Sequence, residues 1–266
     1  MKLELTSATL TEGQTAYSIA GRGVPVVLIH GVGMRQQVWA PQVHMLSQHF
    51  QVITYDTLGH GDSQDPPEAA TLQQYCMQLR QLMDHLAIAR AHVVGHSMGA
   101  LIALEFALTH PERCQRVVAL NAVFCRTPAQ MHAIAQRVES LQTSGIEASL
   151  DATIARWFEN TTDPNMNAIA AQVREFLRSA HPLGYRRAYE LFARSDRAHI
   201  DRLSHVSMPV LFMTGEFDSN STPTMSQAMA QLAPRARVDV LMDARHMMTL
   251  THADAINQRL VQFLAT

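Results

Sequence analysis

The sequence predicts an α/β protein in which a mostly parallel sheet is covered by helices on both faces and carries a helical insertion. Short apolar runs alternate with longer helical patterns, which is typical of such a sheet. Residues 126–205 break this alternation, because they contain helical patterns and no convincing strand. A length of 266 residues suits one large domain with an insertion.

The elements follow from the apolar spacing along the chain. The N-terminal segment alternates in polarity, which favours a half-buried strand, whereas later runs such as Val24–Ile29 are almost continuously apolar, as in buried parallel strands. The predicted strands are at about 2–8, 14–20, 24–29, 50–55, 91–94, 116–120, 209–213 and 238–241. The predicted helices between them are at about 38–48, 71–86, 98–109, 224–232 and 253–264.

The insertion is expected to be a helical cap. It contains helical patterns at about 131–143, 148–158 and 167–179, and at roughly 80 residues it is too long for one crossover between strands. Insertions that follow strand carboxyl ends lie over the active-site face of such sheets, so the cap should shape the substrate pocket. The expected domains are therefore a core of residues 1–125 and 206–266 and a cap of residues 126–205.

Composition excludes several classes of protein. Lys and Arg number 21 against 23 Asp and Glu, without a basic patch, so nucleic acid is not an expected partner. Three cysteines, Cys76, Cys114 and Cys125, have no metal-type spacing, and their odd number fits a reducing compartment. The N-terminus does not read as a signal peptide, and no apolar stretch approaches the ~20 residues that cross a bilayer. We therefore expect a cytoplasmic protein without a membrane partner.

The strongest motif is Gly95-His96-Ser97-Met98-Gly99, between a predicted buried strand and a predicted helix. A serine at such a turn is held in a strained backbone conformation that exposes its hydroxyl. The small residues Gly95 and Gly99 allow the strand and the helix to approach each other. The alternative is that Ser97 is an ordinary helix cap. The strand before it and the helix after it favour a nucleophile, so Ser97 is the candidate nucleophile.

A serine hydroxyl needs a base, and the base needs an acid that orients it. Asp218 follows the strand at 209–213, and His246 follows the strand at 238–241, so both side chains can converge on the edge of the sheet where Ser97 lies. The alternatives for the acid are Glu216 and Asp243. Other histidines are expected to be structural or to line the pocket: His30, His60, His96 and His252.

Two backbone N–H groups should stabilise the negative oxygen of the transition state. We assign them to Met98, which lies at a helix N-terminus, and to Val32, in the turn after the strand at 24–29. The N–H of Gly33 is the alternative to that of Val32.

Together the motifs resemble the α/β-hydrolase family over essentially the whole chain. The matching residues are His30-Gly31-Val32-Gly33, Asp56-x-x-Gly59-His60-Gly61-Asp62-Ser63, Gly95 to Gly99, Gly215-Glu216-x-Asp218 and His246. The resemblance implies an eight-stranded sheet, a cap after the sixth strand, no cofactor, no metal and a structural role for the loop at 56–63. Ser97 stands where dehalogenases and epoxide hydrolases of this fold carry Asp, so the resemblance is to the serine esterase and lactonase type.

The cap is similar to that of 3-oxoadipate enol-lactonases, on the strength of Pro182-Leu183-Gly184-Tyr185 and Ser195-Asp196. Most family members carry Gly before the catalytic His, whereas this chain carries Arg245. We therefore expect a cofactor-independent serine hydrolase that cleaves a small ester, lactone or activated amide through an acyl-enzyme. The alternatives are a receptor of this fold with little turnover and a carbon–carbon bond hydrolase, although the latter often has Asn where this chain has His96.

The substrate pocket is predicted from aromatic, Met and Arg residues near the motifs. Arg35 and Arg126 are candidates for binding an acidic substrate, and Arg245 is a third. The full set of predicted substrate-binding residues is Arg35, Trp39, Phe124, Arg126, Trp157, Phe158 and Met247. The cap and the edge strands also offer surfaces for a homodimer.

Overall fold

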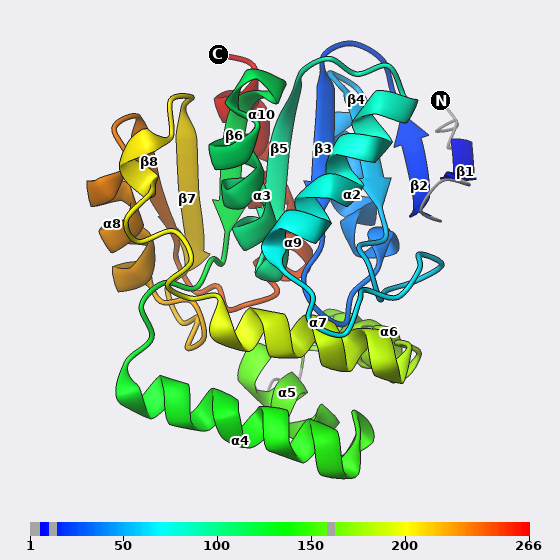
Figure 1. Cartoon of the computed structure of the whole chain (residues 1–266), viewed down its shortest axis with the longest axis vertical. Coiled ribbons are helices and arrows are strands. Elements are labelled where there is room, and N and C mark those ends of the chain that lie inside the picture. Colours follow the sequence, from blue (N-terminus) through cyan, green and yellow to red (C-terminus); the bar gives the residue numbers. More distant parts are fainter. Residues whose placement is uncertain (1–5, 11–14, 159–162) are drawn as a thin grey trace.

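The computed structural model describes residues 6–10, 15–158 and 163–266, which form one eight-stranded sheet with helices around it (Figure 1). In the order of the sheet, the strands are β1 (Thr6–Leu10), β2 (Thr15–Ala20), β4 (Gln51–Tyr55), β3 (Pro25–Ile29), β5 (Ala91–His96), β6 (Cys114–Leu120), β7 (Val210–Gly215) and β8 (Ala236–Leu241). β2 runs antiparallel to β1 and β4, and all other pairs are parallel. The predicted fold class is confirmed; of the first predicted strand, residues 2–5 lie outside the described residues.

Helices of the core cover both faces of the sheet. They are α1 (Ala40–Leu46), α2 (Leu72–His85), α3 (Met98–Thr109), α8 (Pro223–Leu232), α9 (Met248–Thr251) and α10 (Ala253–Leu264). In Figure 1, α2 and α3 lie in front of the sheet and α10 lies behind it, where it contacts α1. α3 is buried on all sides, because it packs against β5, β6 and α2 together. This rigid packing fixes the turn that joins β5 to α3.

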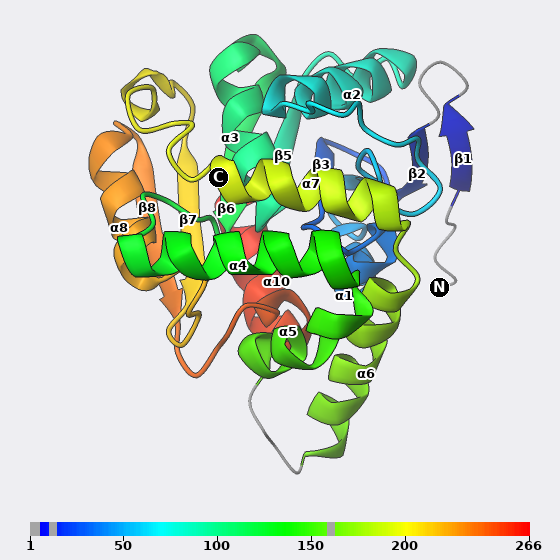
Figure 2. The same ribbon diagram turned by 60° about the horizontal axis from the view of Figure 1, so that its bottom comes forward.

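Among the residues that the structure describes, four further α-helices lie between β6 and β7 in the chain. They are α4 (Pro128–Ser144), α5 (Leu150–Trp157), α6 (Pro164–Arg178) and α7 (Pro182–Arg194). α4 and α7 pack against each other across the carboxyl ends of the parallel strands, and α5 packs against α6 (Figure 2). These helices occupy the segment expected to be a cap, and its division from the core at residues 126 and 205 stays a prediction.

α7 docks on the core through a contact between two glycines. A Cβ built on Gly184 would lie 2.3 Å from the carbonyl oxygen of Gly59, so a side chain at this position would push α7 away from the loop at 56–63. Beyond this contact, the guanidinium of Arg187 donates to the carbonyl of Pro66 at 2.7 Å, and that of Arg194 donates to the carbonyl of Ala70 at 2.6 Å. The loop at 56–63 and the segment that follows it up to Ala70 therefore position α7.

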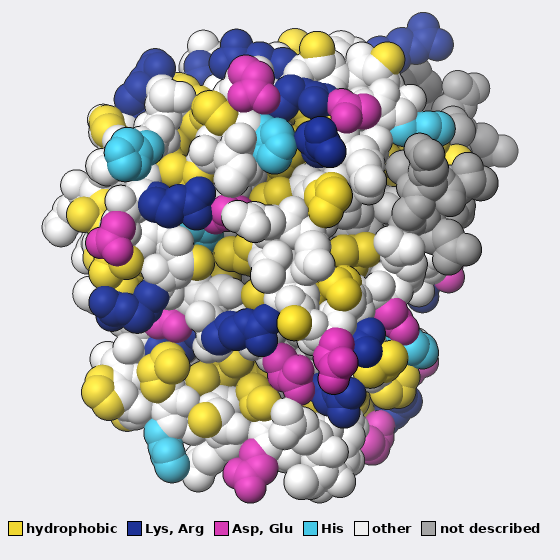
Figure 3. Space-filling model, in the orientation of Figure 1, with side chains coloured by type: hydrophobic (Ala, Val, Ile, Leu, Met, Phe, Trp, Pro, Cys, Tyr) yellow, Lys and Arg dark blue, Asp and Glu magenta, His cyan; other side chains and the backbone are white. Residues whose placement is uncertain are grey.

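Charged side chains of both signs are interspersed on the face of the molecule seen in Figure 3. This distribution agrees with the nearly balanced composition of the chain. No helix among the described residues is long and apolar enough to span a membrane.

Candidate active site

Ser97 lies at a strained turn between β5 and α3. Its φ of 57° and ψ of −117° lie in a region that a residue with a Cβ adopts at a cost of about 1–3 kcal/mol. Two close approaches hold this turn: a Cβ on Gly95 would lie 2.0 Å from the carbonyl oxygen of Gly99, and a Cβ on Gly99 would lie 2.1 Å from that of Ile29. The glycines of the motif therefore allow the packing that projects the Ser97 hydroxyl from the sheet.

The three side chains predicted to cooperate form one continuous hydrogen-bonded chain. The Ser97 hydroxyl donates to Nε2 of His246 at 3.2 Å, and Nδ1 of His246 donates to Oδ2 of Asp218 at 2.8 Å. Asp218 follows β7 and His246 follows β8, at the same edge of the sheet as Ser97. All three are buried, with exposed fractions of 7% for Ser97, 3% for Asp218 and 2% for His246.

Asp218 is held as a carboxylate by a set of donors. Its Oδ1 accepts the N–H groups of Asn220 at 2.8 Å and Ser221 at 3.1 Å, and its Oδ2 accepts from the Asn121 amide at 2.8 Å. Burial alone would raise the pKa of Asp218, but the His246 imidazole and the hydrogen bonds from His246, Asn121 and Asn220 outweigh it and lower this pKa. The side chain is therefore an anion at neutral pH and can stabilise a positive charge on His246.

Asn121 is a site residue that the sequence reasoning missed. It directly follows β6, in a left-handed conformation with φ 51°, and so its amide lies at the same edge of the sheet as Asp218. A polar residue directly after a buried strand was the available signal. The two alternative acids lie elsewhere: Glu216 accepts the backbone N–H of Asp243 at 3.1 Å, and neither carboxylate is hydrogen-bonded to His246.

The backbone N–H groups considered as donors to the negative oxygen differ in whether they already form a hydrogen bond within the protein. The N–H of Gly33, the alternative to Val32, donates to Nε2 of His60 at 2.9 Å and is therefore occupied. Within the described residues, the N–H groups of Val32 and Met98 donate to no protein acceptor. Val32 also lines the cavity that contains Ser97. This geometry favours Val32 over Gly33 beside Met98.

The turn that carries Val32 is fixed by the loop at 56–63. A Cβ on Gly31 would lie 3.0 Å from Cβ of Ser97, so the turn packs directly against the serine. The Asp56 carboxylate accepts the N–H of Gln36 at 2.7 Å and that of Asp62 at 3.1 Å. Asp56 thus ties the end of the turn to the loop behind it.

A cavity of about 140 Å³ lies above Ser97 and His246, between the core and the cap. Of the predicted substrate-binding residues, Arg126 and Trp157 line it, as does Val32, which was predicted as an oxyanion donor. The Trp157 ring lies 5.3 Å from the His246 ring, centroid to centroid. Cap residues that were not predicted also line it: Gln130, Ala133, Ile134, Arg137, Arg156, Tyr185, Tyr189 and Phe192.

Five predicted substrate-binding residues do not line this cavity, which corrects the expected pocket: Arg35, Trp39, Phe124, Phe158 and Met247. The Arg35 guanidinium lies 3.8 Å from the Asp62 carboxylate instead. Trp39 is fully buried, with its ring perpendicular to that of His96. The other three side chains are also buried in the hydrophobic core.

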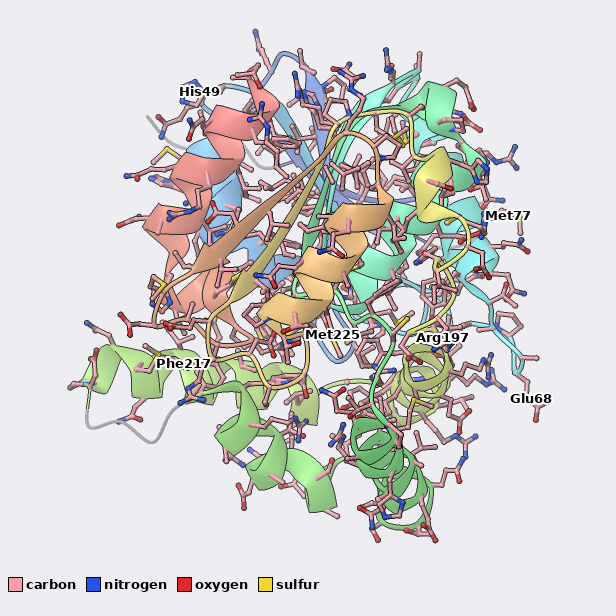
Figure 4. All side chains as sticks on the ribbon, turned by 90° about the vertical axis from the view of Figure 1, so that its left-hand side faces the viewer. His49, Glu68, Met77, Arg197, Phe217 and Met225 are labelled. Atoms are coloured by element: carbon pink, nitrogen blue, oxygen red, sulfur yellow. The ribbon has the colours of Figure 1, made fainter. Side chains whose placement is uncertain are left out.

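Arg245, the third arginine considered for an acidic substrate, also does not line the cavity. Its guanidinium carbon lies 5.7 Å from the centroid of the Phe217 ring. Figure 4 shows Phe217 where the loops after the strands meet the cap. Arg245 thus contacts the Phe217 ring, outside the residues that line the cavity.

Three histidines around the site are buried, and their burial predicts sensitivity to acid. Burial lowers the pKa of His30 to about 4 and the pKa values of His60 and His96 to about 3, against 6.5 for an ordinary histidine. Below about pH 6.5 the unfolded chain therefore binds more protons than the folded chain, and stability falls as the pH falls towards these lower values. Each histidine should contribute a loss of up to about 1.4 kcal/mol per pH unit.

Urea unfolding between about pH 7.5 and pH 5 measures this loss. His60→Gln, which cannot be protonated, should show a shallower dependence of unfolding free energy on pH than the parent chain. The same slope in both proteins would contradict the assignment of His60 as a buried neutral group.

The chain belongs to the α/β-hydrolase fold family, whose sequence pattern matches residues 24–253. It is 35% identical over 259 residues, 97% of each chain, to (E)-2-((N-methylformamido)methylene)succinate hydrolase of Acinetobacter baylyi. It is 30% identical over 234 residues, 88% of this chain and 85% of the relative, to 3-oxoadipate enol-lactonase 1 of the same organism. The crystal structure of the enol-lactonase from Burkholderia xenovorans LB400 matches with a TM-score of 0.89 and 31% identity, covering 98% of this chain and 100% of that one. The resemblance drawn from the motifs is confirmed, and the protein is a hydrolase of this fold.

Proposed function

We propose that the protein is a serine hydrolase that cleaves a small ester, lactone or activated amide through an acyl-enzyme. The observation that carries this proposal is the unbroken path from the Ser97 hydroxyl through the His246 imidazole to the Asp218 carboxylate, with distances of 3.2 Å and 2.8 Å. Such a path is what converts an alcohol into a nucleophile at neutral pH.

In the first half of the reaction, Ser97 Oγ attacks the substrate carbonyl while His246 Nε2 accepts the hydroxyl proton. His246 then donates that proton to the leaving group, and the acyl group stays on Ser97. In the second half, His246 takes a proton from water, which attacks the acyl-enzyme, and returns it to Ser97 as the acid leaves. Asp218 keeps the imidazole in the tautomer whose Nε2 can accept, and stabilises the imidazolium that forms twice in the cycle.

The oxyanion of each tetrahedral intermediate would be bound by the N–H groups of Val32 and Met98. Both are without a protein acceptor among the described residues, and Met98 is the first residue of α3, where the helix dipole favours negative charge. One such donor contributes about 3 kcal/mol of transition-state stabilisation. The site is buried, which strengthens these interactions relative to water.

The class of substrate is supported by the cavity and by the relatives. A volume of about 140 Å³ is below the range of about 300–1,000 Å³ for drug-sized ligands, so the substrate should be small. The names of the two Acinetobacter relatives contain the acids succinate and 3-oxoadipate. We infer that the substrate of this chain carries a free carboxylate in addition to the bond that is cleaved.

A panel of substrates tests this proposal. Steady-state turnover should be measured for an activated ester, an enol-lactone and an N-acyl enamine, each prepared with and without a carboxylate. We expect turnover of at least one carboxylate-bearing member without any added cofactor. If every member of the panel were bound but none were hydrolysed, the protein would act as a receptor and the proposed function would be wrong.

A further inference from the structure

Three arginines of the cap line the cavity above Ser97: Arg126, Arg137 and Arg156. No Asp or Glu among the described residues lines it with them. A partly buried cavity with several cations and no anion is an electrostatic environment that favours a negatively charged ligand. The three charges differ in how far the protein itself already neutralises them.

Arg126 is already neutralised by the protein. Its Nη1 lies 3.5 Å from the Asp196 carboxylate, both side chains are only 4% exposed, and the same nitrogen donates to the carbonyls of Phe192 and Ala193. Its guanidinium also lies over the Phe192 ring, 4.7 Å from the centroid. Arg126 therefore joins the start of the cap to the end of α7, and it is not the free cation that the sequence suggested.

Arg137 on α4 and Arg156 on α5 are different, because neither forms an ion pair with a carboxylate of the described residues. Arg137 donates from Nε to the Tyr189 hydroxyl at 3.0 Å. Arg156 donates to the carbonyl of Ala152 at 3.4 Å and to the Thr153 hydroxyl at 3.3 Å, and its buried Nε has no partner in the part of the chain that the structure describes. Both guanidinium groups thus retain unused donors and their full positive charge.

The two charges also act on each other. Burial, and after it the positive charge of Arg137, lower the pKa of Arg156. A guanidinium nevertheless stays protonated at neutral pH, so the protein holds two like charges together in the cavity. Two like charges repel each other, and a carboxylate placed between the two groups would offset the repulsion and satisfy the free donors.

We propose that Arg137 and Arg156 form a carboxylate-binding subsite that orients the substrate for attack by Ser97. The inference rests on the proposed function, since Ser97 and His246 line the same cavity and supply the chemistry. The small cavity requires a short spacer, so the substrate is a derivative of a small dicarboxylic acid in which one carboxyl is bonded to the leaving group as an ester, lactone or amide and the other is free.

The test compares two esters that differ only at the far end, 4-nitrophenyl hexanoate and mono-4-nitrophenyl adipate. We expect the parent enzyme to prefer the adipate ester, and the ratio of the two kcat/KM values to fall by about tenfold in Arg137→Met and in Arg156→Met and by about 100-fold in the double variant. Arg156→Lys should retain part of the preference, because lysine keeps the positive charge but lacks the paired, planar N–H donors of a guanidinium. Arg174→Met is the matched control, because Arg174 is a cap arginine that pairs with Asp151 at 2.7 Å outside the cavity.

A ratio that changes by less than about twofold in the double variant would overturn the subsite. Because both esters are cleaved at the same bond, this failure leaves the proposed hydrolase intact. Conversely, if no ester is turned over, adipate binding to the Ser97→Ala variant, measured by calorimetry, still tests the arginines, since it should be lost in the double variant. Inorganic phosphate that binds as tightly as adipate would overturn the assignment to a carboxylate.

Discussion

Replacing Ser97 by alanine is expected to lower kcat by at least about 10⁴-fold while the fold remains intact. Loss of the nucleophile in enzymes with this relay costs up to about 10⁶-fold in kcat, and the remaining rate comes from the oxyanion donors and from substrate binding. Alanine keeps the Cβ of Ser97 and removes only the hydroxyl that donates to His246, so the packing of the turn between β5 and α3 does not change.

The measurement is single-turnover and steady-state kinetics on the best ester of the panel, with far-UV circular dichroism and thermal unfolding as controls. The variant should retain the unfolding temperature of the parent and its affinity for adipate. A folded Ser97→Ala protein with more than about a tenth of the parental kcat would contradict a role for Ser97 as nucleophile.

Replacing Asp218 by asparagine is expected to lower kcat by about 10⁴-fold. The Asn amide can donate to Nδ1 of His246, which would place the ring proton on Nε2 and remove the acceptor that Ser97 requires. It would also remove the negative charge that stabilises the imidazolium. Asp218 is 3% exposed and is surrounded by donors, so its replacement leaves the carboxylate-specific bonds of Asn121 and Ser221 weakened as well.

The matched control is Asp243→Asn. Asp243 is exposed, has a left-handed backbone with φ 58° that Asn also tolerates, and is not hydrogen-bonded to His246. Its kcat should stay within about threefold of the parent. A large loss of kcat in Asp243→Asn together with a small loss in Asp218→Asn would contradict the assignment, because it would make Asp243 the acid that orients His246.

The core fold and the positions of Ser97, Asp218 and His246 were predictable for one physical reason. Parallel strands place their carboxyl ends at one edge of the sheet, so polar residues after the strands at 91–94, 209–213 and 238–241 must lie near one another. The strained turn at Ser97 was also predictable, because Gly95 and Gly99 indicate a close approach of backbone that the structure contains. Asn121, which follows the same rule after β6, could have been found in the same way.

The lining of the cavity could not be predicted from sequence, because it depends on how each cap helix is rotated and on which helices meet. Arg137 and Arg156 lie on different helices, and each has the sequence context of a solvated surface charge. The converse error occurred at Arg35, which adjoins the motif at 30–33 in the sequence but faces Asp62 in the structure. Proximity along the chain was a poor guide wherever a contact joins segments that are distant in the sequence, as between Arg126, just before α4, and Asp196, just after α7.

The most direct test of the proposed mechanism is to locate the residue that becomes covalently modified by a fluorophosphonate, which reacts with an activated serine and leaves a stable adduct. Intact-protein and peptide mass spectrometry should detect one adduct per chain, on the peptide that contains Ser97, and its formation should parallel the loss of esterase activity. His246→Ala should greatly slow this labelling. Complete inactivation with the adduct on another residue, or full esterase activity in a protein whose Ser97 is fully modified, would contradict the mechanism.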